Sequence, residues 1–171
     1  PLEIVRAGVP VEFPSEVLQD AAEFDIETLM NDPRRVDLTS LPTFTVDDAT
    51  TRDRDDAVSI EMDESGKAHR IGIHIADAGA LVAHTGAVDG EAARRMATLY
   101  LPEGKVPMVP PELSEEKGSL LPGNAKPVLS VLVRFDDLGE PIESEIVRGT
   151  VQVDTGLSYH DADEAMADPE H

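Results

Sequence analysis

Apolar residues occupy every second position in two neighbouring segments of the chain. They alternate with polar or small residues over 58–62 and again over 71–76, and the turn-forming stretch 63–67 separates the two segments. A period of two is typical of β-strands, and a short polar connection between two such runs predicts a hairpin. Segments 128–135 and 142–153 predict a second strand pair, of which the latter strand is long and twisted or bulged.

Three other segments place apolar residues at helical spacing. Residues from Ser15 onward predict a packing helix with a serine cap, and residues 26–30 predict a second, short helix. A third helix is predicted to begin near Asp89. Its inward-facing residues are expected to be Ala93, Met96 and Ala97. With residues 34–42 as a connector, strands and helices are mixed in this chain.

The composition of the chain limits its possible roles. Its 171 residues, of which 40% are hydrophobic and 29% charged, are enough for one domain with a sizeable core. The net charge of -21 argues against a general electrostatic grip on polyanions. Any nucleic-acid partner is therefore held locally or by parts outside this chain.

The absence of cysteine and of long apolar runs bears on location. Without cysteine there is no disulfide framework, which suits a reducing cytoplasm. No apolar run approaches the length of a membrane span, and the first six residues have no signal-peptide pattern. We therefore expect a cytoplasmic protein with no membrane partner. Because the chain starts without methionine and stops in a helix-like segment, we also expect it to be a piece of a longer protein.

Residues 44–61 combine apolar residues with a dense acidic cluster. Five aspartates fall within ten positions: Asp47, Asp48, Asp53, Asp55 and Asp56. The flanking apolar residues, expected to lie inside, are Phe44, Val46, Val58 and Ile60. Carboxylates this close cannot all stay ionised without a compensating cation, because repulsion and desolvation raise their pKa values. The pattern indicates a divalent metal site where a loop enters a strand, and an acidic surface loop without metal is the alternative.

The type of ligand narrows the choice of metal. Oxygen ligands favour Mg²⁺, Mn²⁺ or Ca²⁺ over zinc. A calcium loop of the EF-hand type fails on spacing, because Ala57 and Val58 stand where an oxygen ligand and a glycine are needed. Phosphoryl-transfer chemistry fits better, since Mg²⁺ held by one or two carboxylates completes its shell with water and phosphate oxygens.

Three further residues have both a functional and a structural interpretation. His74 lies in a predicted strand, where histidine is more often hydrogen-bonded structure, and Asp77 follows that strand, where it more often caps a turn. Both are left outside the site. Tyr100 is one of two tyrosines and is a candidate for stacking on a base, but its spacing alone favours packing in the core.

The acidic stretch resembles the active-site signature of the ribonuclease II family. Val46 to Ala57 contains an aspartate, a five-residue gap and Asp-x-Asp-Asp-Ala, as in the catalytic RNB domain of that family. Further similar segments follow in family order: His74–Asp77, Tyr100–Pro102, Val106–Ser114 and Ser119–Pro122. The resemblance implies that residues 1–40 are a linker with a helix and 41–171 the N-terminal portion of an RNB-type domain. The implied fold is α+β, with a mixed, largely antiparallel sheet or barrel and flanking helices.

The resemblance also implies an activity. It is that of a 3′-to-5′ exoribonuclease that hydrolyses single-stranded RNA to nucleoside 5′-monophosphates by a metal-assisted, two-metal mechanism. The implied cofactor is Mg²⁺, with Mn²⁺ as a substitute, and the implied partner is the 3′ end of single-stranded RNA. The positions that match the four catalytic and metal-binding acids of the family are Asp47, Asp53, Asp55 and Asp56.

Individual roles follow from the same resemblance. Asp47 and Asp56 are expected to be the firmest metal ligands, with Asp53 supporting the cation shell. Asp55 is expected to serve a second metal or the attacking water. Tyr100 matches the family tyrosine that stacks on the terminal base, and Tyr159 matches a tyrosine implicated in preferring ribose.

Some features depart from the family pattern. Arg54 stands where the family often has an apolar or aromatic residue, and Asp48 matches no family role. The family's later catalytic half and its RNA-gripping S1 domain would lie beyond His171, so this piece alone is expected to be inactive. Two rival functions stay open: a catalytically inactive RNB-like module for RNA binding or scaffolding, and an acidic calcium-binding structural domain.

Overall fold

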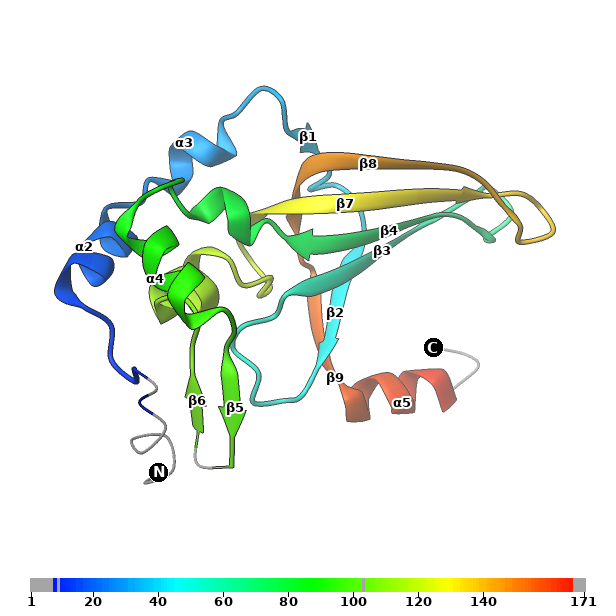
Figure 1. Cartoon of the computed structure of the whole chain (residues 1–171). Helices are drawn as coiled ribbons and strands as arrows, with labels where there is room; N and C mark the ends of the chain where they lie inside the picture. Colours follow the sequence, from blue (N-terminus) through cyan, green and yellow to red (C-terminus); the bar gives the residue numbers. More distant parts are fainter. Residues whose placement is uncertain (1–7, 9, 103, 168–171) are drawn as a thin grey trace.

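The computed structural model of the chain, which describes residues 8, 10–102 and 104–167, consists of a large sheet with most of its helices at one end and the C-terminal helix beside the last strand (Figure 1). The absence of a signal peptide was inferred from residues 1–6, which lie outside the described residues. Within the described part, no helix is both long enough and apolar enough to cross a membrane.

A seven-stranded sheet with the order β1-β8-β7-β4-β3-β2-β9 forms the body of the fold. Neighbouring strands are antiparallel except for the parallel pairs β1/β8 and β2/β9. This confirms the expected α+β class with a mixed, largely antiparallel sheet. The strands are β1 (Val36–Asp37), β2 (Thr43–Asp47), β3 (Asp56–Met62), β4 (Ala68–Ala76), β7 (Ala125–Phe135), β8 (Pro141–Gln152) and β9 (Thr155–Ser158). The predicted connector at 34–42 thus contains a short strand, β1.

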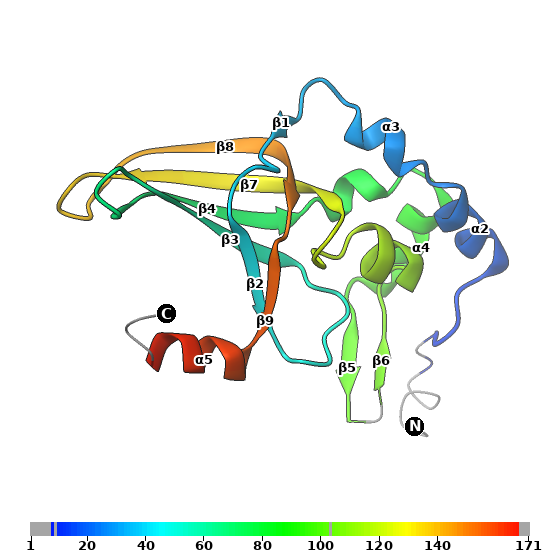
Figure 2. The same ribbon diagram turned by 180° about the vertical axis from the view of Figure 1, so that it is seen from behind.

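Helices and a small separate hairpin flank the sheet (Figures 1 and 2). The helices are α2 (Ser15–Glu23), α3 (Ile26–Met30), α4 (Ala87–Arg95) and α5 (Tyr159–Ala167), with a 3₁₀ turn η1 (Ala78–Leu81) and a π-helical turn η2 (Glu112–Lys117). The hairpin pairs β5 (Leu99–Leu101) with β6 (Gly104–Val106). The predicted serine cap is wrong, because Pro14 occupies the N-cap position of α2 and Ser15 is its first helical residue.

The inward face of α4 also differs from the prediction. Ala93, Met96 and Ala97 are exposed, whereas Val88, Glu91 and Ala92 are buried. Glu91 is tolerated inside because its carboxylate lies 2.6 Å from Arg94 and 2.7 Å from Arg95. Val88 joins a cluster that links α2, α4 and η2 through Val17, Ala21 and Leu113.

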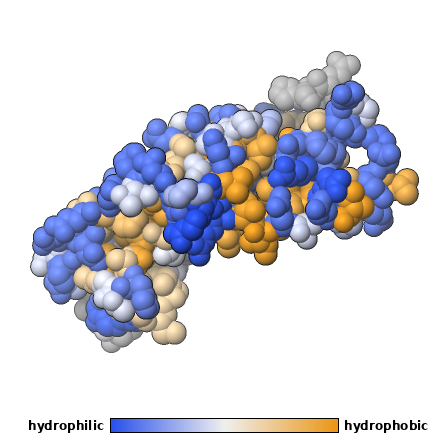
Figure 3. Space-filling view, turned by 90° about the horizontal axis from the view of Figure 1, so that it is seen from above, coloured by the Kyte–Doolittle hydropathy of each residue, from blue (hydrophilic) through white to orange (hydrophobic). Residues whose placement is uncertain are grey.

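The two faces of the sheet are covered unequally. One face is buried and bears the core aliphatics Val128, Leu132 and Val151 together with small or polar residues, namely Thr43, Thr45, Ala57, Ser59, Gly72, His74 and Ser130. The opposite face carries aliphatic side chains that solvent reaches, including Ile73 (44% exposed), Ile75 (45%), Leu129 (45%) and Ile146 (70%). Phe44, Val46, Val58 and Ile60, which were expected inside, are only half-buried. Apolar surface also appears among hydrophilic residues in the space-filling view (Figure 3).

A buried histidine joins three strands on the covered face. The His74 ring nitrogens are hydrogen-bonded to the hydroxyls of Ser130 (Nδ1, 2.8 Å) and Ser59 (Nε2, 2.9 Å), and the residue is fully buried. Gly72 makes room for this arrangement, because a Cβ there would lie 2.7 Å from His74 Nε2. His74 is therefore structural, as its place in a strand predicted.

Acidification is expected to destabilise the fold through His74. Burial lowers the pKa of His74 to about 4, from 6.5, so below pH 6.5 the unfolded chain binds a proton that the folded chain rejects. Keeping the ring neutral therefore costs no unfolding free energy above pH 6.5, and the loss of unfolding free energy grows as the pH falls towards 4. Between pH 8 and pH 5.5 we expect a loss of about 1.4 kcal/mol of unfolding free energy from this residue.

The measurement is urea unfolding of the wild type and of His74→Gln at both pH values. Since the carboxylates titrate in both proteins, the difference between the two isolates the histidine. Parallel losses of stability in both proteins would contradict the assignment.

Candidate active site at the junction of β2 and β3

The aspartate cluster occupies the loop between two neighbouring strands. Asp47 is the last residue of β2 and Asp56 is the first of β3, with residues 48–55 forming the loop between them. β2 is held on its other edge by β9, where Asp47 is the register partner of Ser158. The cluster therefore lies where a loop meets a strand, as predicted, on a frame held from both sides.

Local hydrogen bonds fix the first half of the loop. The Asp48 carboxylate accepts hydrogen bonds from the backbone NH of Thr50 (2.9 Å) and from its hydroxyl (2.6 Å). This is the turn geometry that aspartate favours. The sequence suggested no role for Asp48, and the structure shows that it shapes the loop. Among the described residues, it makes no hydrogen bond to another aspartate of the cluster.

A distant segment fixes the second half of the loop. The Ser119 hydroxyl accepts a hydrogen bond from Arg54 NH (3.0 Å) and donates one to the Arg52 carbonyl (2.7 Å). Leu120 NH donates to the Arg54 carbonyl (2.9 Å). On the far side, Ala76 NH donates to the Asp55 carbonyl (2.8 Å). The Ser119–Pro122 motif therefore holds the acidic loop in place.

Arg54 points into the protein beneath the cluster. Its Nη1 donates to the Thr45 hydroxyl (2.6 Å), and its Nε lies 3.6 Å from Asp47 Oδ2. The side chain is 8% exposed and passes over Gly156 of β9, where a Cβ would lie 3.1 Å from Arg54 Cζ. Arg54 thus supplies an internal positive charge to Asp47 and does not face outward.

Burial and neighbouring negative charges raise the pKa values of two of the carboxylates, Asp47 and Asp55. Burial raises the pKa of Asp47, and the charges of Asp56 and Asp53 add to the rise, whereas Arg54 opposes it. Desolvation likewise raises the pKa of Asp55, and the carboxylates of Asp53, Asp56 and Asp47 raise it further. Asp55 keeps an exposed surface, yet the surrounding walls remove part of its hydration. The charges of the neighbouring aspartates therefore act on both Asp47 and Asp55.

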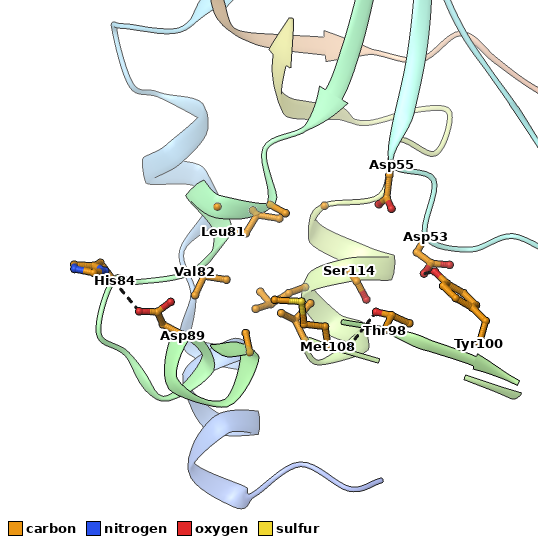
Figure 4. Close-up of a pocket in the computed structure, with 16 residues that line it drawn as sticks. Asp53, Asp55, Leu81, Val82, His84, Asp89, Thr98, Tyr100, Met108 and Ser114 are labelled. Atoms are coloured by element: carbon orange, nitrogen blue, oxygen red, sulfur yellow. Dashed lines mark hydrogen bonds and ion pairs between the residues drawn. The ribbon is translucent and has the colours of Figure 1, made fainter. Parts of the chain in front are cut away.

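A cavity of about 450 Å³ opens beside the loop (Figure 4). Asp53, Asp55 and Tyr100 lie along one wall, and the rest is lined mainly by apolar residues such as Leu81, Val82 and Met108. The polar residues His84, Asp89, Thr98 and Ser114 also contribute to the lining. The Tyr100 hydroxyl donates a hydrogen bond to Asp53 Oδ2 (3.3 Å), and its side chain is 71% exposed. The core position that spacing alone favoured for Tyr100 is therefore wrong.

The four predicted carboxylates have the oxygen donors that a divalent metal ion needs, but they are not arranged as a complete coordination sphere. Among the described residues, no three His, Cys, Asp or Glu side chains are arranged to hold an ion together. Asp53 and Asp55 line the cavity, whereas Asp47 and Asp56 lie at the strand ends and are not among its lining residues. Asp47 Oδ2 is buried without a hydrogen-bond partner in the described part of the chain. Hard oxygen donors of this kind suit Mg²⁺ or Mn²⁺.

Other predicted residues lie outside the cavity wall. Tyr159 is the first residue of α5 and is 62% exposed, next to the Ser158 that pairs with Asp47, but it does not line the cavity. Asp77 is bound to Arg35 (2.6 Å) and makes no side-chain cap, although its carbonyl closes a turn with Ala80 NH.

Two charged residues near the cluster, Lys105 and Glu115, were not predicted from the sequence. Lys105 on β6 places its Nζ 3.0 Å from Asp53 Oδ2 and 2.8 Å from Glu115 Oε1. Burial alone would lower the pKa of Lys105, but its hydrogen bonds to Glu115 and Asp53 outweigh this and raise it. The signal available in the sequence was the Pro102 and Gly104 turn, which predicts a hairpin and places Lys105 opposite Tyr100.

Comparisons with known proteins agree with this geometry. The model of the RNB domain family matches residues 35–171. The chain is 37% identical over 163 residues to an uncharacterized ribonuclease of Synechocystis sp., covering 94% of this chain and 24% of that protein. The structure of Mycoplasma genitalium RNase R in complex with ribose-methylated single-stranded RNA superposes with a TM-score of 0.84 at 27% identity, covering 96% of this chain and 26% of that one.

A third comparison bears on the fold alone. Yeast Ssd1, described as a pseudonuclease, superposes with a TM-score of 0.71 at 21% identity and covers 84% of this chain and 17% of its own. The chain spans about a quarter of the length of the curated relatives it matches.

Proposed function

The chain belongs to the RNB domain family, and from this premise we propose that it forms part of the active site of a metal-dependent 3′-to-5′ exoribonuclease. The proposed substrate is single-stranded RNA, and the proposed products are nucleoside 5′-monophosphates. The observation that carries the proposal is the cavity at the β2–β3 junction, where an exposed tyrosine stands beside electrostatically coupled carboxylates. We expect the protein to act in the cytoplasm.

Asp47, Asp53, Asp55 and Asp56 would hold the metal. When bound as one ion or as a pair, Mg²⁺ or Mn²⁺ would lower the pKa of a water molecule and would stabilise the charge that develops on the leaving 3′ oxygen. Because the charge of a cation offsets the repulsion among the carboxylates, the acidic loop favours binding of the ion. The Ser119–Leu120 hydrogen bonds keep the loop from moving apart when the cation is absent.

The cavity suits the end of an RNA strand. Tyr100 offers an exposed ring on which the terminal base stacks, and the apolar wall excludes water from the reacting phosphate. The raised pKa of Asp55 makes its carboxylate a better proton acceptor, which fits a role in orienting the attacking water. Tyr159, outside the cavity, would contact the ribose of a neighbouring nucleotide.

The test is an RNA degradation assay with the full-length protein. A single-stranded oligoribonucleotide labelled at its 5′ end is expected to shorten stepwise from its 3′ end, with nucleoside 5′-monophosphates identified by mass spectrometry. Chelation with EDTA is expected to stop the reaction and added Mg²⁺ or Mn²⁺ to restore it. A protein that binds the RNA but leaves it intact with either metal would contradict the proposal.

Tyr100→Ala is expected to weaken binding of single-stranded RNA by about tenfold or more, because base stacking on an aromatic ring contributes about 1–3 kcal/mol. Fluorescence anisotropy in EDTA measures binding without hydrolysis. Tyr100→Phe is the matched control, since it keeps the ring and loses only the hydrogen bond to Asp53. Equal affinity of the wild type and Tyr100→Ala would remove the tyrosine from the proposed RNA site.

One observation favours a second candidate, an inactive RNA-binding module. Two of the four carboxylates already face basic side chains, Asp47 that of Arg54 and Asp53 that of Lys105. Such pairs could replace a metal permanently, and the fold is also that of the pseudonuclease Ssd1. This candidate predicts RNA binding that is independent of divalent metal and no hydrolysis in the assay above.

A further inference from the structure

The β5–β6 hairpin brings a lysine and the exposed tyrosine to the acidic loop together. Tyr100 and Lys105 are register partners across the two strands, so their side chains lie on the same face of the hairpin. Figure 1 shows this hairpin standing beside the sheet and helices as a separate arm. Both side chains reach the same atom, Asp53 Oδ2, at 3.3 Å from the tyrosine hydroxyl and 3.0 Å from the lysine Nζ.

Lys105 also has a second acidic partner on another element. Glu115 of η2 places Oε1 2.8 Å from its Nζ, and the lysine side chain is 25% exposed. The ammonium group therefore lies between Glu115 and Asp53, and Asp53 lines the cavity. A single lysine thus links the acidic loop, the hairpin and η2 through contacts that are electrostatic and reversible.

We infer that Lys105 is a positioning residue with two states. Without a divalent ion, its ammonium group occupies the cation position at Asp53. When the ion binds, the ammonium group moves to the RNA phosphate beside the base stacked on Tyr100. The inference rests on the proposed metal-dependent function. In this inference the partner of Lys105 is Asp53 in the metal-free site and an RNA phosphate in the site that holds metal and RNA.

The exchange follows from charge and reach. An ammonium ion and a divalent cation cannot share one carboxylate oxygen without strong repulsion, so metal at Asp53 displaces the lysine. Glu115 remains in reach, and the flexible four-carbon stem lets the ammonium group turn without movement of the backbone. Because Tyr100 lies directly opposite on the hairpin, a base on its ring brings a phosphate near the freed lysine.

Chemical labelling of lysine amines measures the exchange directly. The full-length protein is treated briefly with an amine-acetylating reagent, and labelling of Lys105 is quantified by mass spectrometry without divalent metal, with Mg²⁺, and with Mg²⁺ plus a non-hydrolysable single-stranded oligoribonucleotide. We expect labelling to rise severalfold on addition of Mg²⁺ and to fall again when the RNA analogue is added. Lys67, exposed in the β3–β4 turn, serves as the internal control and is expected to stay constant.

Binding of Mn²⁺ to variants gives a second, independent measurement. Lys105→Met removes the competing ammonium and is expected to tighten Mn²⁺ binding by about five- to tenfold, as followed by electron paramagnetic resonance. Lys67→Met removes the same charge far from the cluster and is expected to change the affinity less than twofold. If Lys105→Met fails to fold, as judged by circular dichroism, Lys105→Gln takes its place, because its amide retains hydrogen bonding to both carboxylates.

The outcomes separate this inference from the proposed function. Constant labelling of Lys105 in all three states, together with Mn²⁺ affinity unchanged by its substitution, would overturn the exchange even if the wild type degrades RNA. A wild type that neither binds Mn²⁺ nor degrades RNA would overturn the proposed function itself. Labelling that rises with Mg²⁺ but is unaffected by the RNA analogue would overturn the step to phosphate.

Discussion

Asp55→Asn is expected to lower the rate of RNA hydrolysis by about a thousandfold or more, with RNA binding nearly unchanged. The substitution keeps the size of the side chain and its exposed position but removes the charge on which proton acceptance and cation binding depend. Desolvation and the neighbouring carboxylates raise the pKa of Asp55, which lines the cavity, and so make it a better proton acceptor. Loss of this one charge therefore removes chemistry and leaves the stacking surface of Tyr100 intact.

Asp48→Asn is the matched control for this prediction. It removes one charge from the same loop, while the asparagine oxygen still accepts the hydrogen bonds from Thr50 that shape the turn. Its rate is expected to stay within a fewfold of the wild type. Single-turnover assays with labelled RNA measure the rate, and anisotropy in EDTA measures binding. Equal losses in both variants would mean that the overall charge of the loop, and not Asp55, determines activity.

Gly72→Ala is expected to lower the free energy of unfolding by about 2–4 kcal/mol. The added methyl group would collide with the Ser59 hydroxyl and the His74 ring, which are fully buried and hydrogen-bonded to each other. Neither can move away without leaving a buried polar atom unpaired. The expected effect is therefore larger than that of a simple increase in volume.

Gly90→Ala provides the opposite case for comparison. Gly90 lies inside α4, and an alanine methyl group at this position would have no atom of another element within 4 Å, so the substitution restricts the unfolded chain without a collision. An increase of about 0.5–1 kcal/mol in unfolding free energy is expected. Urea titrations at pH 8 measure both variants. A neutral effect of Gly72→Ala would show that β3 and β4 can separate enough to accept the methyl group, and the close packing around His74 would then be wrong.

Local periodicity predicted the elements well because it depends on neighbouring residues. The short helix over residues 26–30 and the β3–β4 hairpin were both confirmed. The strand β1 was missed because its two residues carry no period of their own. They are held in extended form by parallel pairing with β8, more than a hundred positions later in the chain.

The orientation of the strands could not be predicted from one strand at a time. In β4 the apolar residues Ile73 and Ile75 are exposed, whereas His74 between them is buried. Its burial depends on hydroxyl groups supplied by β3 and β7, which the sequence places 15 and 56 positions away. The error on α4 has a similar cause, because Glu91 is buried only with the help of two arginines.

The candidate site was predicted in part. A dense run of aspartates is visible in the sequence because the residues are adjacent, and the family resemblance suggested a role for Tyr100. The basic partners were not predicted, since Arg54 could equally have faced solvent and Lys105 meets Asp53 only through the hairpin. The four carboxylates as metal ligands, and Tyr159 as an RNA contact, stay predictions.

Because Arg54 packs over Gly156, the residue types at positions 54 and 156 depend on each other, although a sequence comparison would treat the two positions as independent. A guanidinium group at 54 needs the space that only glycine leaves at 156, because the two residues meet under the acidic loop. Grafting this loop onto a related scaffold with a larger residue at the second position would displace the arginine and deprive Asp47 of its internal counter-charge. Transplantation of the loop should therefore carry both positions together.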